Sequence, residues 1–383
     1  IKGLSAKGFI NYNQNYSFYK IFVSAPDSWS YNYSNDTYTK QTTAMVPELR
    51  HRDTRNRVLT GQLSLNYDRT FGELHQLNAL ALYEVIDSYN DWISAGRIGF
   101  KTDAIDYLFA GGIANQTSDG SASEMGRQSY IGRLNYAFDS KYLLETTLRI
   151  DESAKFAKES RRGVFPSLSL GWRISQENFM RNSLPFIDNL KIRASLSQTG
   201  NDAVGNFQYL SGYKYGAAYL IGSAASTGLV ESAMANPFLT WETMTIYNAG
   251  LDFSLRKRLF YGEFDVFSRD RIDIPGTRSR SLPTTFGASL PVENLNSINT
   301  RGFEVLLGHN GNIQDFRYEI STNLSWSRSK WTYFDEPEYD DPDQERQNKR
   351  TGQWTDRMFG YISDGLFTSQ EEIDALEYWY NET

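Results

Sequence analysis

The sequence has 383 residues and contains no cysteine. It has only ten prolines and three histidines. The absence of cysteine excludes disulfides, thiolate metal sites, a cysteine nucleophile and lipid attachment to cysteine, but it leaves the compartment open. The low proline and ordinary glycine contents exclude collagen-like and low-complexity chains. No long basic run occurs, the formal net charge is −7 and the isoelectric point is near 5.2. We therefore expect no nucleic-acid partner.

Long hydrophobic runs are also missing. No stretch of about 18 consecutive apolar residues occurs, so the sequence predicts no transmembrane helix. The mean hydropathy of −0.54 resembles that of a soluble chain, but a membrane β-barrel also has this property because its strands alternate lipid-facing and lumen-facing side chains. The chain does not begin with methionine and shows no signal peptide, and we expect both termini to be cuts in a longer chain.

The sequence is rich in alternation between apolar and polar residues. Every second residue is apolar in 167–175, and the same pattern recurs in 142–151 and 190–197. Alternation over about 8–12 residues indicates a half-buried strand and does not fit a helix. The sequence therefore predicts an all-β chain.

The order of connections predicts the topology. We expect one or two strands in 3–22, and further strands at 58–69, 74–88, 91–101, 104–114, 129–138, 141–152, 164–175, 189–199, 242–256, 259–270, 300–310 and 314–328. Tight turns are expected at 71–72, 139–140, 256–258 and 311–312, and long segments at 23–57, 115–128, 153–163, 200–241, 271–299 and 329–383. Short and long connections alternate, with an extra short one near Asn90. This order is typical of an antiparallel up-and-down outer-membrane barrel. Segment 176–188 is the one longer connection on the short-turn side, and we expect a helical turn there.

Aromatic residues gather beside the short turns: Tyr67, Phe71, Tyr136, Phe138, Tyr142, Phe260, Tyr261, Phe316 and Tyr318. Amphipathic rings favour the headgroup level of a membrane, so this clustering predicts an interfacial girdle. The alternative is a soluble β-sandwich with an aromatic core. Sandwich strands usually have about 5–6 residues, whereas a transmembrane strand needs about 9–11. The predicted strands have the greater length, which favours the membrane barrel.

Catalytic motifs are missing, so we expect neither an enzyme nor a cofactor. His51, His75 and His309 are scattered and lack metal-ligand spacing, and we expect them in solvent or in the girdle. Neither a G-x-S-x-G elbow nor a phosphate-binding G-x-x-x-x-G-K loop occurs, and no carboxylate pair stands out among 46 acids.

One acidic stretch offers hard oxygen ligands for Ca²⁺: Asp335, Glu336, Glu338, Asp340, Asp341, Asp343 and Glu345. It lacks the spacing of a calcium-binding loop, and Pro337 and Pro342 favour an extended, solvated loop. Calcium binding there stays open.

Aromatic residues in two long segments are candidate substrate-binding residues: Trp29, Tyr31, Tyr33, Tyr213, Tyr215 and Tyr219. Flat rings stack on sugars and also grip peptides. The alternatives are packing of loop on loop, or an outer girdle. A second set of residues carries charge on the predicted lumen face, where it would line a solute path or simply solvate the wall: Arg133, Lys141, Glu145, Arg149, Arg173, Lys191 and Arg193.

A series of short phrases also points to a known family. Their order along the chain is Gly132-Arg133-Leu134-Asn135-Tyr136, Leu148-Arg149-Ile150-Asp151, Gly163-Val164-Phe165-Pro166-Ser167, Gly171-Trp172-Arg173-Ile174-Ser175, Leu190-Lys191-Ile192-Arg193-Ala194-Ser195, Thr199-Gly200-Asn201, Asn299-Thr300-Arg301-Gly302-Phe303-Glu304, Phe359-Gly360-Tyr361 and Asp364-Gly365-Leu366-Phe367. This series resembles the barrel of the SusC/RagA family of TonB-dependent outer-membrane transporters, over about two thirds of the chain.

The resemblance implies that residues 1–383 are part of a single outer-membrane β-barrel domain with long extracellular loops. They would supply about 12–14 strands of a plugged barrel of about 22 strands, and the signal peptide and plug would lie outside this sequence. The resemblance also implies a bacterial outer-membrane importer of oligosaccharides or peptides, capped by a SusD-like lipoprotein and energised by TonB through the plug. The alternatives are a passive porin or surface-binding barrel, and a soluble β-rich glycan-binding domain.

Overall fold

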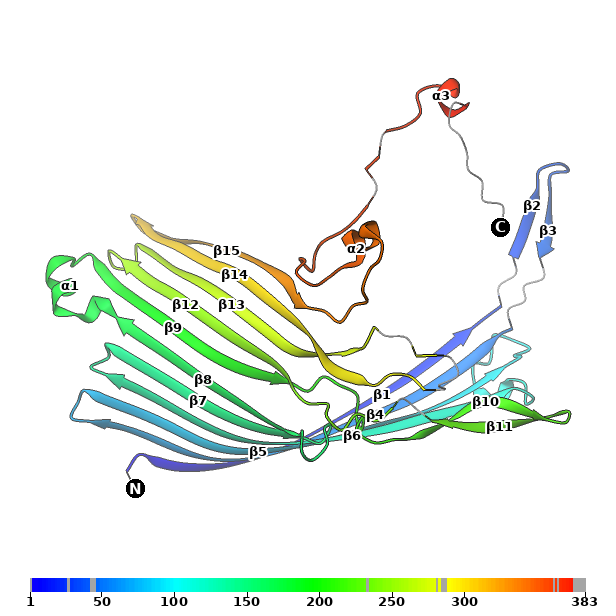
Figure 1. Ribbon diagram of the computed structural model, residues 1–383, viewed down its shortest axis with the longest axis horizontal. Helices are drawn as coiled ribbons and strands as arrows, with labels where there is room; N and C mark the ends of the chain where they lie inside the picture. Colours follow the sequence, from blue (N-terminus) through cyan, green and yellow to red (C-terminus); the bar gives the residue numbers. More distant parts are fainter. Residues whose placement is uncertain are drawn as a thin grey trace.

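The computed structural model describes residues 2–25, 28–41, 46–231, 234–279, 282–283, 288–360, 362–363 and 365–374, without the side chains of 217–219 and 224–225. Within these residues an 11-stranded antiparallel sheet dominates, in the order β1-β4-β5-β6-β7-β8-β9-β12-β13-β14-β15 (Figure 1). Two further hairpins, β2–β3 and β10–β11, stand at the end of the sheet where the long connections lie.

The elements have the following bounds. The sheet consists of β1 (Leu4–Val23), β4 (Glu48–Phe71), β5 (His75–Ile98), β6 (Gln116–Phe138), β7 (Tyr142–Ser153), β8 (Arg162–Arg173), β9 (Ile187–Asn201), β12 (Glu242–Leu255), β13 (Phe260–Thr277), β14 (Val292–Ile313) and β15 (Phe316–Tyr333). The hairpins are β2 (Ser28–Asn32) with β3 (Thr37–Gln41), and β10 (Tyr213–Ile221) with β11 (Ala224–Glu231). The helices are α1 (Asn178–Ser183), α2 (Pro342–Asn348) and α3 (Gln370–Asp374), and 3-10 turns occupy Leu108–Ala110 and Ile174–Gln176.

The predicted up-and-down topology is confirmed, because sequence neighbours in the sheet pair antiparallel throughout. The predicted helical turn in 176–188 is also confirmed, as α1. The predicted strand at 104–114 is wrong: that segment contains a 3-10 turn. The predicted break near Asn90 is wrong as well, since β5 continues from His75 to Ile98, and residues 116–128 belong to β6 and not to a loop.

The errors at Asn90 and at 116–128 share a physical cause. Residues 87–97 and 116–128 are polar on both faces, so they lack the alternation that identified the other strands. Their strand conformation is held by the backbone ladder, in which Asn90 pairs with Asn56 on one side and Ser123 on the other. With the break removed, short turns and long connections alternate, and the one longer connection on the short-turn side is the α1 segment between β8 and β9. The sheet has 11 strands, below the expected 12–14.

The two faces of the sheet differ in chemistry. Residues directly opposite one another in the ladder share a face, so Arg193, Gly250 and Asp265 lie on one face of β9, β12 and β13. We call this the polar face. The opposite, apolar face carries large side chains that remain exposed: Leu63, Leu65, Leu148, Leu168, Leu170, Ile192, Leu196, Phe264, Leu307, Leu324 and Trp326.

This exposure excludes a soluble β-sandwich. A sandwich would cover its apolar strand faces with a second sheet. Within the described residues, the buried hydrophobic side chains number seven and lie toward the long-connection end: Leu49, Phe100, Phe156, Ala157, Phe165, Leu239 and Trp241. An exposed apolar face backed by a polar one is the pattern of a barrel wall in a membrane. Among the described helices, none has the length and apolar character to span a membrane.

The predicted aromatic girdle lies beside the short turns on the apolar face, with one exception. Phe138 stacks on Tyr142 with ring centroids 6.3 Å apart, and Phe316 stacks on Tyr318 at 6.2 Å. Tyr261 was expected in the girdle, but it shares the polar face with Asp265 and donates to Glu319 at 2.6 Å. Alternation decides this, because Tyr261 is one residue from Phe260 and so points to the opposite face.

Two histidines belong to the girdle. His75 lies 2.7 Å, Nδ1 to Oη, from Tyr136, and its ring centroid is 4.9 Å from that of Phe138. His309 packs between Phe260 and Tyr318. The girdle interpretation of these two histidines is therefore confirmed, whereas His51 packs against Phe18 in the long-connection half.

The long-connection end has a small core of its own, which we call the loop cluster: Phe156, Phe165, Leu239 and Trp241, with Val204 and Val292 packed against it. The indole Nε1 of Trp241 donates to the carbonyl of Arg161 at 2.8 Å, which ties the connection before β12 to the one before β8. Asn294 and Thr240 exchange two hydrogen bonds of 2.9 Å. These contacts join two connections and the start of β14, which are far apart in sequence.

The pairing of β8 with β9 stops short of the loop cluster. The ladder runs from Arg173–Lys191 to Ser167–Ser197 and ends there, although both strands continue. Beyond that point the ring of Phe165 lies over Gly200, where an added Cβ would meet the ring at 2.0 Å. Side-chain packing thus replaces the backbone ladder.

Candidate functional site

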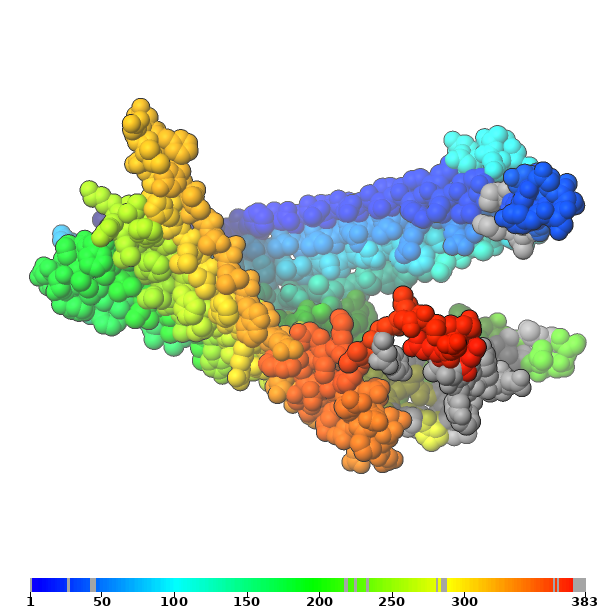
Figure 2. All heavy atoms as spheres, turned by 90° about the horizontal axis from the view of Figure 1, so that it is seen from above, coloured from blue at the N-terminus to red at the C-terminus, as the bar shows by residue number. Residues whose placement is uncertain are grey.

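The polar face is the candidate site, because it combines a hollow shape with paired charges. Seen from above (Figure 2), the blue strand β1 and the orange strand β15 lie on either side of a hollow bounded by the curved sheet. The polar face lines the sheet from the short turns to the loop cluster. A solute moving along the strands would meet charged and hydroxyl side chains along this face.

Arg193 is the centre of the largest charge network on this face. Its guanidinium donates to Asp252 at 2.9 Å and binds Asp265 in bidentate geometry at 2.8 and 2.6 Å, while Lys191 reaches Asp252 at 3.2 Å. The network crosses three strands, β9, β12 and β13. Bidentate guanidinium–carboxylate pairs fix both distance and orientation, so these strands present a defined charge pattern.

Glycine at position 250 makes this network possible. Gly250 stands directly between Arg193 and Asp265 in the ladder. A Cβ there would come within 2.7 Å of both Arg193 Cζ and Asp265 Oδ1. The absence of a side chain on the middle strand lets charges on the outer two strands meet above it.

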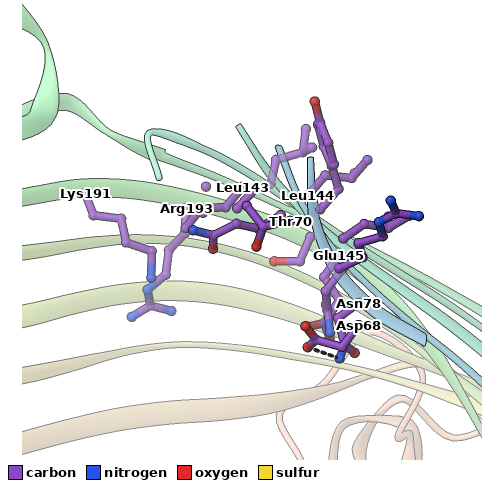
Figure 3. Close-up of a pocket in the computed structure, with 17 residues that line it drawn as sticks. Asp68, Thr70, Asn78, Leu143, Leu144, Glu145, Lys191 and Arg193 are labelled. Atoms are coloured by element: carbon purple, nitrogen blue, oxygen red, sulfur yellow. Dashed lines mark hydrogen bonds between the residues drawn. The ribbon is translucent and has the colours of Figure 1, made fainter. Parts of the chain in front are cut away.

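A cavity of about 410 Å³ lies nearer the short turns (Figure 3). Asp68, Asn78, Glu145, Lys191 and Arg193 line it, and Asn78 donates to Asp68 at 3.1 Å. With Arg69, which also lines it, the cavity combines two acids with three bases. It is a polar recess in the wall and contains no catalytic constellation among these residues.

A second network lies on β6 and β7. Arg149 donates from Nε to Asp151 at 2.6 Å and from Nη2 to the hydroxyl of Ser129 at 3.1 Å. Asp151 and Ser129 are buried. Burial of an aspartate requires such partners, so this pair anchors the wall beneath the long connections.

A third network fixes the connection after β9. Buried Asp202 accepts hydrogen bonds from Arg127 and, at 2.7 Å, from Ser153, while Lys155 donates to its backbone carbonyl at 2.9 Å. Burial alone would raise the pKa of Asp202, but the hydrogen bonds and the positive charges of Arg127 and Lys155 outweigh it and lower the pKa below its usual value. Asp202 is therefore ionised and holds three segments together.

The structure places the predicted lumen-facing charges as expected. The register puts Arg133, Glu145, Arg149, Arg173, Lys191 and Arg193 on the polar face. Lys141 precedes the first pair of β7 and forms an ion pair with Asp139 at 2.6 Å beside the turn.

The predicted aromatic residues in the first long segment lie on the hairpin β2–β3. Tyr31 and Tyr38 are cross-strand partners with ring centroids 5.1 Å apart, and Tyr33 meets Tyr31 edge-on at 4.7 Å. The Tyr31 hydroxyl donates to Asp36 at 2.5 Å. Trp29 is also exposed, and the Lys40 ammonium lies 6.0 Å from the centre of its ring. The hairpin therefore presents a small aromatic surface, which includes one ring, Tyr38, that the sequence had not singled out.

The remaining predicted aromatic residues lie on the hairpin β10–β11. Tyr213 and Tyr215 are 75% and 81% exposed, so they have little packing of their own. The side chain of Tyr219 lies outside the described part of the structure. Among the described aromatic residues, no ring contact joins the two hairpins, so the five predicted residues with described side chains form two surfaces and not one.

Two residues of the acidic stretch accept hydrogen bonds from backbone amides nearby in the sequence. Asp341 caps α2 by accepting from the backbone amide of Asp343 at 2.9 Å, and Glu336 accepts from the amides of Arg350 and Thr351. In the described part of the chain, no group of three or more potential ligands is arranged to hold a metal ion.

Sequence reasoning missed the acidic partners of the polar face: Asp202, Glu242, Asp252 and Asp265. The signal was available for Asp252 and Asp265, since each alternates with apolar neighbours and the two lie a few residues before and after the same short turn. Their pairing with Arg193 depends on register across strands, which one sequence does not give.

An antiparallel sheet with an exposed apolar face, a girdle of aromatic residues beside short turns and a charge-paired polar face defines the wall of a transmembrane β-barrel. A family model described as "TonB dependent receptor-like, beta-barrel" matches residues 3–371. The chain therefore belongs to this family of outer-membrane receptors and transporters.

Individual relatives agree with the family. TonB-dependent receptor P39 of Formosa agariphila is 29% identical over 80% of this chain, and TonB-dependent receptor SusC of Bacteroides thetaiotaomicron is 34% identical over 53% of it. Among solved structures, the RagAB peptide transporter covers 90% of the chain with a TM-score of 0.75 at 23% identity, which supports the fold. The matches span 29%, 20% and 36% of those proteins, so the chain corresponds to a third or less of the two receptors and to about a third of the solved chain.

Proposed function

We propose that this chain forms part of the barrel wall of a nutrient importer in the bacterial outer membrane. The supporting observation is the charge-paired polar face, which continues from the short turns to the loop cluster and is backed by an apolar face suited to lipid. Such a wall gives a hydrated path for a solute across the membrane, whereas catalysis would need a constellation of reactive groups.

The cargo in this proposal is an oligosaccharide or a peptide. One relative carries the name SusC, and a structural neighbour is a peptide transporter. A SusD-like surface lipoprotein would cap the long-connection end, and TonB would act on a plug within the barrel, as the resemblance to SusC/RagA transporters implies. The TonB-dependent relatives support an energised importer over a passive porin.

The exposed aromatic rings of the two hairpins are the proposed contact points for substrate or lipoprotein. Trp29 and Tyr215 are one exposed ring from each hairpin, and both stand at the long-connection end (Figure 1). Exposed rings supply large contact area at low entropic cost. Tyr219 belongs to the same proposal through its place in β10.

The first experiment uses the native full-length protein, extracted in detergent from outer membranes. We expect a mass roughly three times the 43.8 kDa of this chain, a plug sequence upstream and a co-purifying lipoprotein. Uptake of labelled oligosaccharides or peptides by cells should cease when TonB is deleted. A protein that co-purifies with no lipoprotein and supports TonB-independent uptake would be a passive porin, and the importer proposal would fail.

The hairpins are tested in the same preparation. Trp29→Ala and Tyr215→Ala should weaken lipoprotein capture or solute uptake about tenfold, since one well-packed aromatic contact contributes on the order of 1–2 kcal/mol. Tyr247→Ala is the matched control, because Tyr247 is also exposed but lies on the apolar face of β12. Equal effects from all three variants would indicate general damage and remove the hairpins from the site.

A further inference from the structure

One half-buried arginine on the polar face has no acceptor for its guanidinium within the described residues. Arg149, Arg193 and Arg271 each pair with a carboxylate of a neighbouring residue. The guanidinium of Arg269 makes neither a hydrogen bond nor an ion pair with the described residues, although the residue is half-buried and its Nε atom is shielded from solvent. Its guanidinium lies over the ring of Phe267, 4.2 Å from the ring centre. Partial burial of a cation without a hydrogen-bond acceptor costs desolvation free energy. Binding of an anion at such a site would offset part of that cost.

The surroundings of Arg269 form a cavity of about 490 Å³ on the polar face, at the level where β13 approaches the loop cluster. Hydroxyl and amide groups supply most of the remaining polar lining: Thr199, Asn201, Thr300 and Ser329. This volume lies in the range of small-ligand pockets. The cavity therefore has room for one charged group and part of the molecule that carries it.

The charge of the cavity is positive by one unit. Arg271 is neutralised by buried Glu242, to which it donates at 2.8 and 2.6 Å. Glu242 is thus already engaged, and it also faces the amide of Asn201 at 3.4 Å. Arg269 is left as the uncompensated charge. Because a guanidinium offers a planar fork of donors, a planar carboxylate is the anion that matches it best.

The same wall is acidic nearer the short turns. Glu263, Asp265 and Glu304 line a separate cavity of about 370 Å³. Asp265 and Arg271 are each neutralised by an ion-pair partner. Along β13 the charge without an ion-pair partner among the described residues therefore changes from the acid Glu263 to the base Arg269. An anionic solute arriving from the long-connection end would meet Arg269 before it meets the acids.

We propose that Arg269 and its hydroxyl-lined cavity bind a carboxylate group of the transported solute. This rests on the proposed importer function and narrows its cargo to acidic sugars or acidic peptides. Both sources present the same carboxylate, and the experiment below separates them.

The test measures binding to the native full-length transporter with its co-purifying lipoprotein. The probes are trigalacturonate, triglutamate and, as an uncharged reference, maltotriose. At least one carboxylate probe should bind more tightly than maltotriose, and Arg269→Gln should weaken that probe about tenfold or more, the loss of one charge-assisted contact. Arg269→Lys keeps the positive charge but loses the planar fork of guanidinium donors. The affinity of this variant for the carboxylate probe should therefore lie between those of the wild type and Arg269→Gln. Binding of trigalacturonate alone identifies a sugar acid, and binding of triglutamate alone an acidic peptide.

Arg133→Gln is the matched control. Arg133 is exposed on the same polar face of β6, away from the cavity, and forms no ion pair within the described residues. An equal loss of affinity for the carboxylate probe in Arg133→Gln and Arg269→Gln would mean that the wall attracts anions in general. That result would overturn the proposal of a specific site. Unchanged binding in Arg269→Gln, or no binding of either carboxylate probe, would also overturn it. If the lipoprotein co-purifies and maltotriose binds in that case, the importer function stands without the carboxylate site.

Discussion

The two halves of the long strands β4, β5 and β6 differ although the backbone ladder is continuous through both. In the half near the short turns, apolar residues dominate one face and most polar residues lie on the other, as at Leu63 and Ser64. In the half near the long connections, both faces carry polar residues, as at Ser88, Tyr89, Asn90 and Asp91. Only the second half belongs to the region where buried hydrophobic residues form a core.

The difference shows what each environment demands of a strand. Lipid contact imposes alternation, because an unpaired polar side chain on the lipid face is costly. Water removes that demand, so the outer half is held by its ladder and by the loop cluster. A strand of 24 residues such as β4 exceeds the about 9–11 residues that span a bilayer. We therefore place the membrane at the alternating half.

The largest expected effect comes from removing the centre of the loop cluster. Trp241→Ala deletes a buried indole and its hydrogen bond to Arg161, which should destabilise the cluster by about 3–5 kcal/mol. Hydrogen exchange of residues 154–161 and 236–241 in the full-length protein should rise, while the ladder of the alternating half stays protected. Trp326→Ala, on the exposed apolar face, is the control and should leave those connections unchanged. Loss of protection along the whole ladder would mean that the two halves are one cooperative unit.

A charge placed on the apolar face tests where the membrane lies. Leu63 and Ile93 are equally exposed, at 66% and 63%, and both point away from the polar face. Leu63→Arg should destabilise the folded protein in bilayers by about 2–4 kcal/mol, whereas Ile93→Arg should cost less than about 1 kcal/mol. Denaturant titration in liposomes measures both. Equal costs would contradict the assignment of the alternating half to lipid.

An added methyl group tests the charge network that crosses three strands. Gly250→Ala should separate Arg193 from Asp265 and cost about 1–3 kcal/mol, because neither neighbouring strand can move away. Gly132→Ala is the matched control, since an added Cβ there meets no atom within 4 Å. Thermal unfolding compares the two. A neutral Gly250→Ala variant would show that the network contributes little to the wall.

The smallest expected effect is a loss of stability of the loop cluster at acidic pH. The hydrogen bonds to Asp202 keep its pKa below the ordinary value. Its stabilising contribution is therefore complete above pH about 4 and is lost as the pH falls through the lowered pKa. Hydrogen exchange of the loop cluster should increase below pH about 4 in the wild type. In Asp202→Asn that increase should be absent, and an equal acid response in both proteins would assign it to other groups.

The alternating half of the fold was predictable from the sequence, and the outer half was not. Leu168, Leu170 and Trp172 indicated β8 directly, because lipid on one side and water on the other impose period two. Residues 116–128 gave no such signal, since strand conformation there depends on pairing with β5. Asn90 looked like a turn for the same reason.

The candidate site shows a similar limit. The charged residues of the polar face, such as Arg193 and Lys191, were predictable because alternation assigns a face. Their partners were not, since Asp265 is 72 residues from Arg193 and meets it only through the register of three strands. Arg269 was unremarkable in the sequence because an uncompensated charge is visible only once the positions of its neighbours are known.

The end of the β8–β9 ladder has a mechanical consequence. Beyond Ser167–Ser197 the two strands are joined by the ring of Phe165 and its contact with Trp241, whose centroids are 5.4 Å apart. A force that separates β8 from β9 at the rim has to break dispersion contacts but no backbone hydrogen bond between them. The rim can therefore widen at this one position while the sheet below it keeps its register.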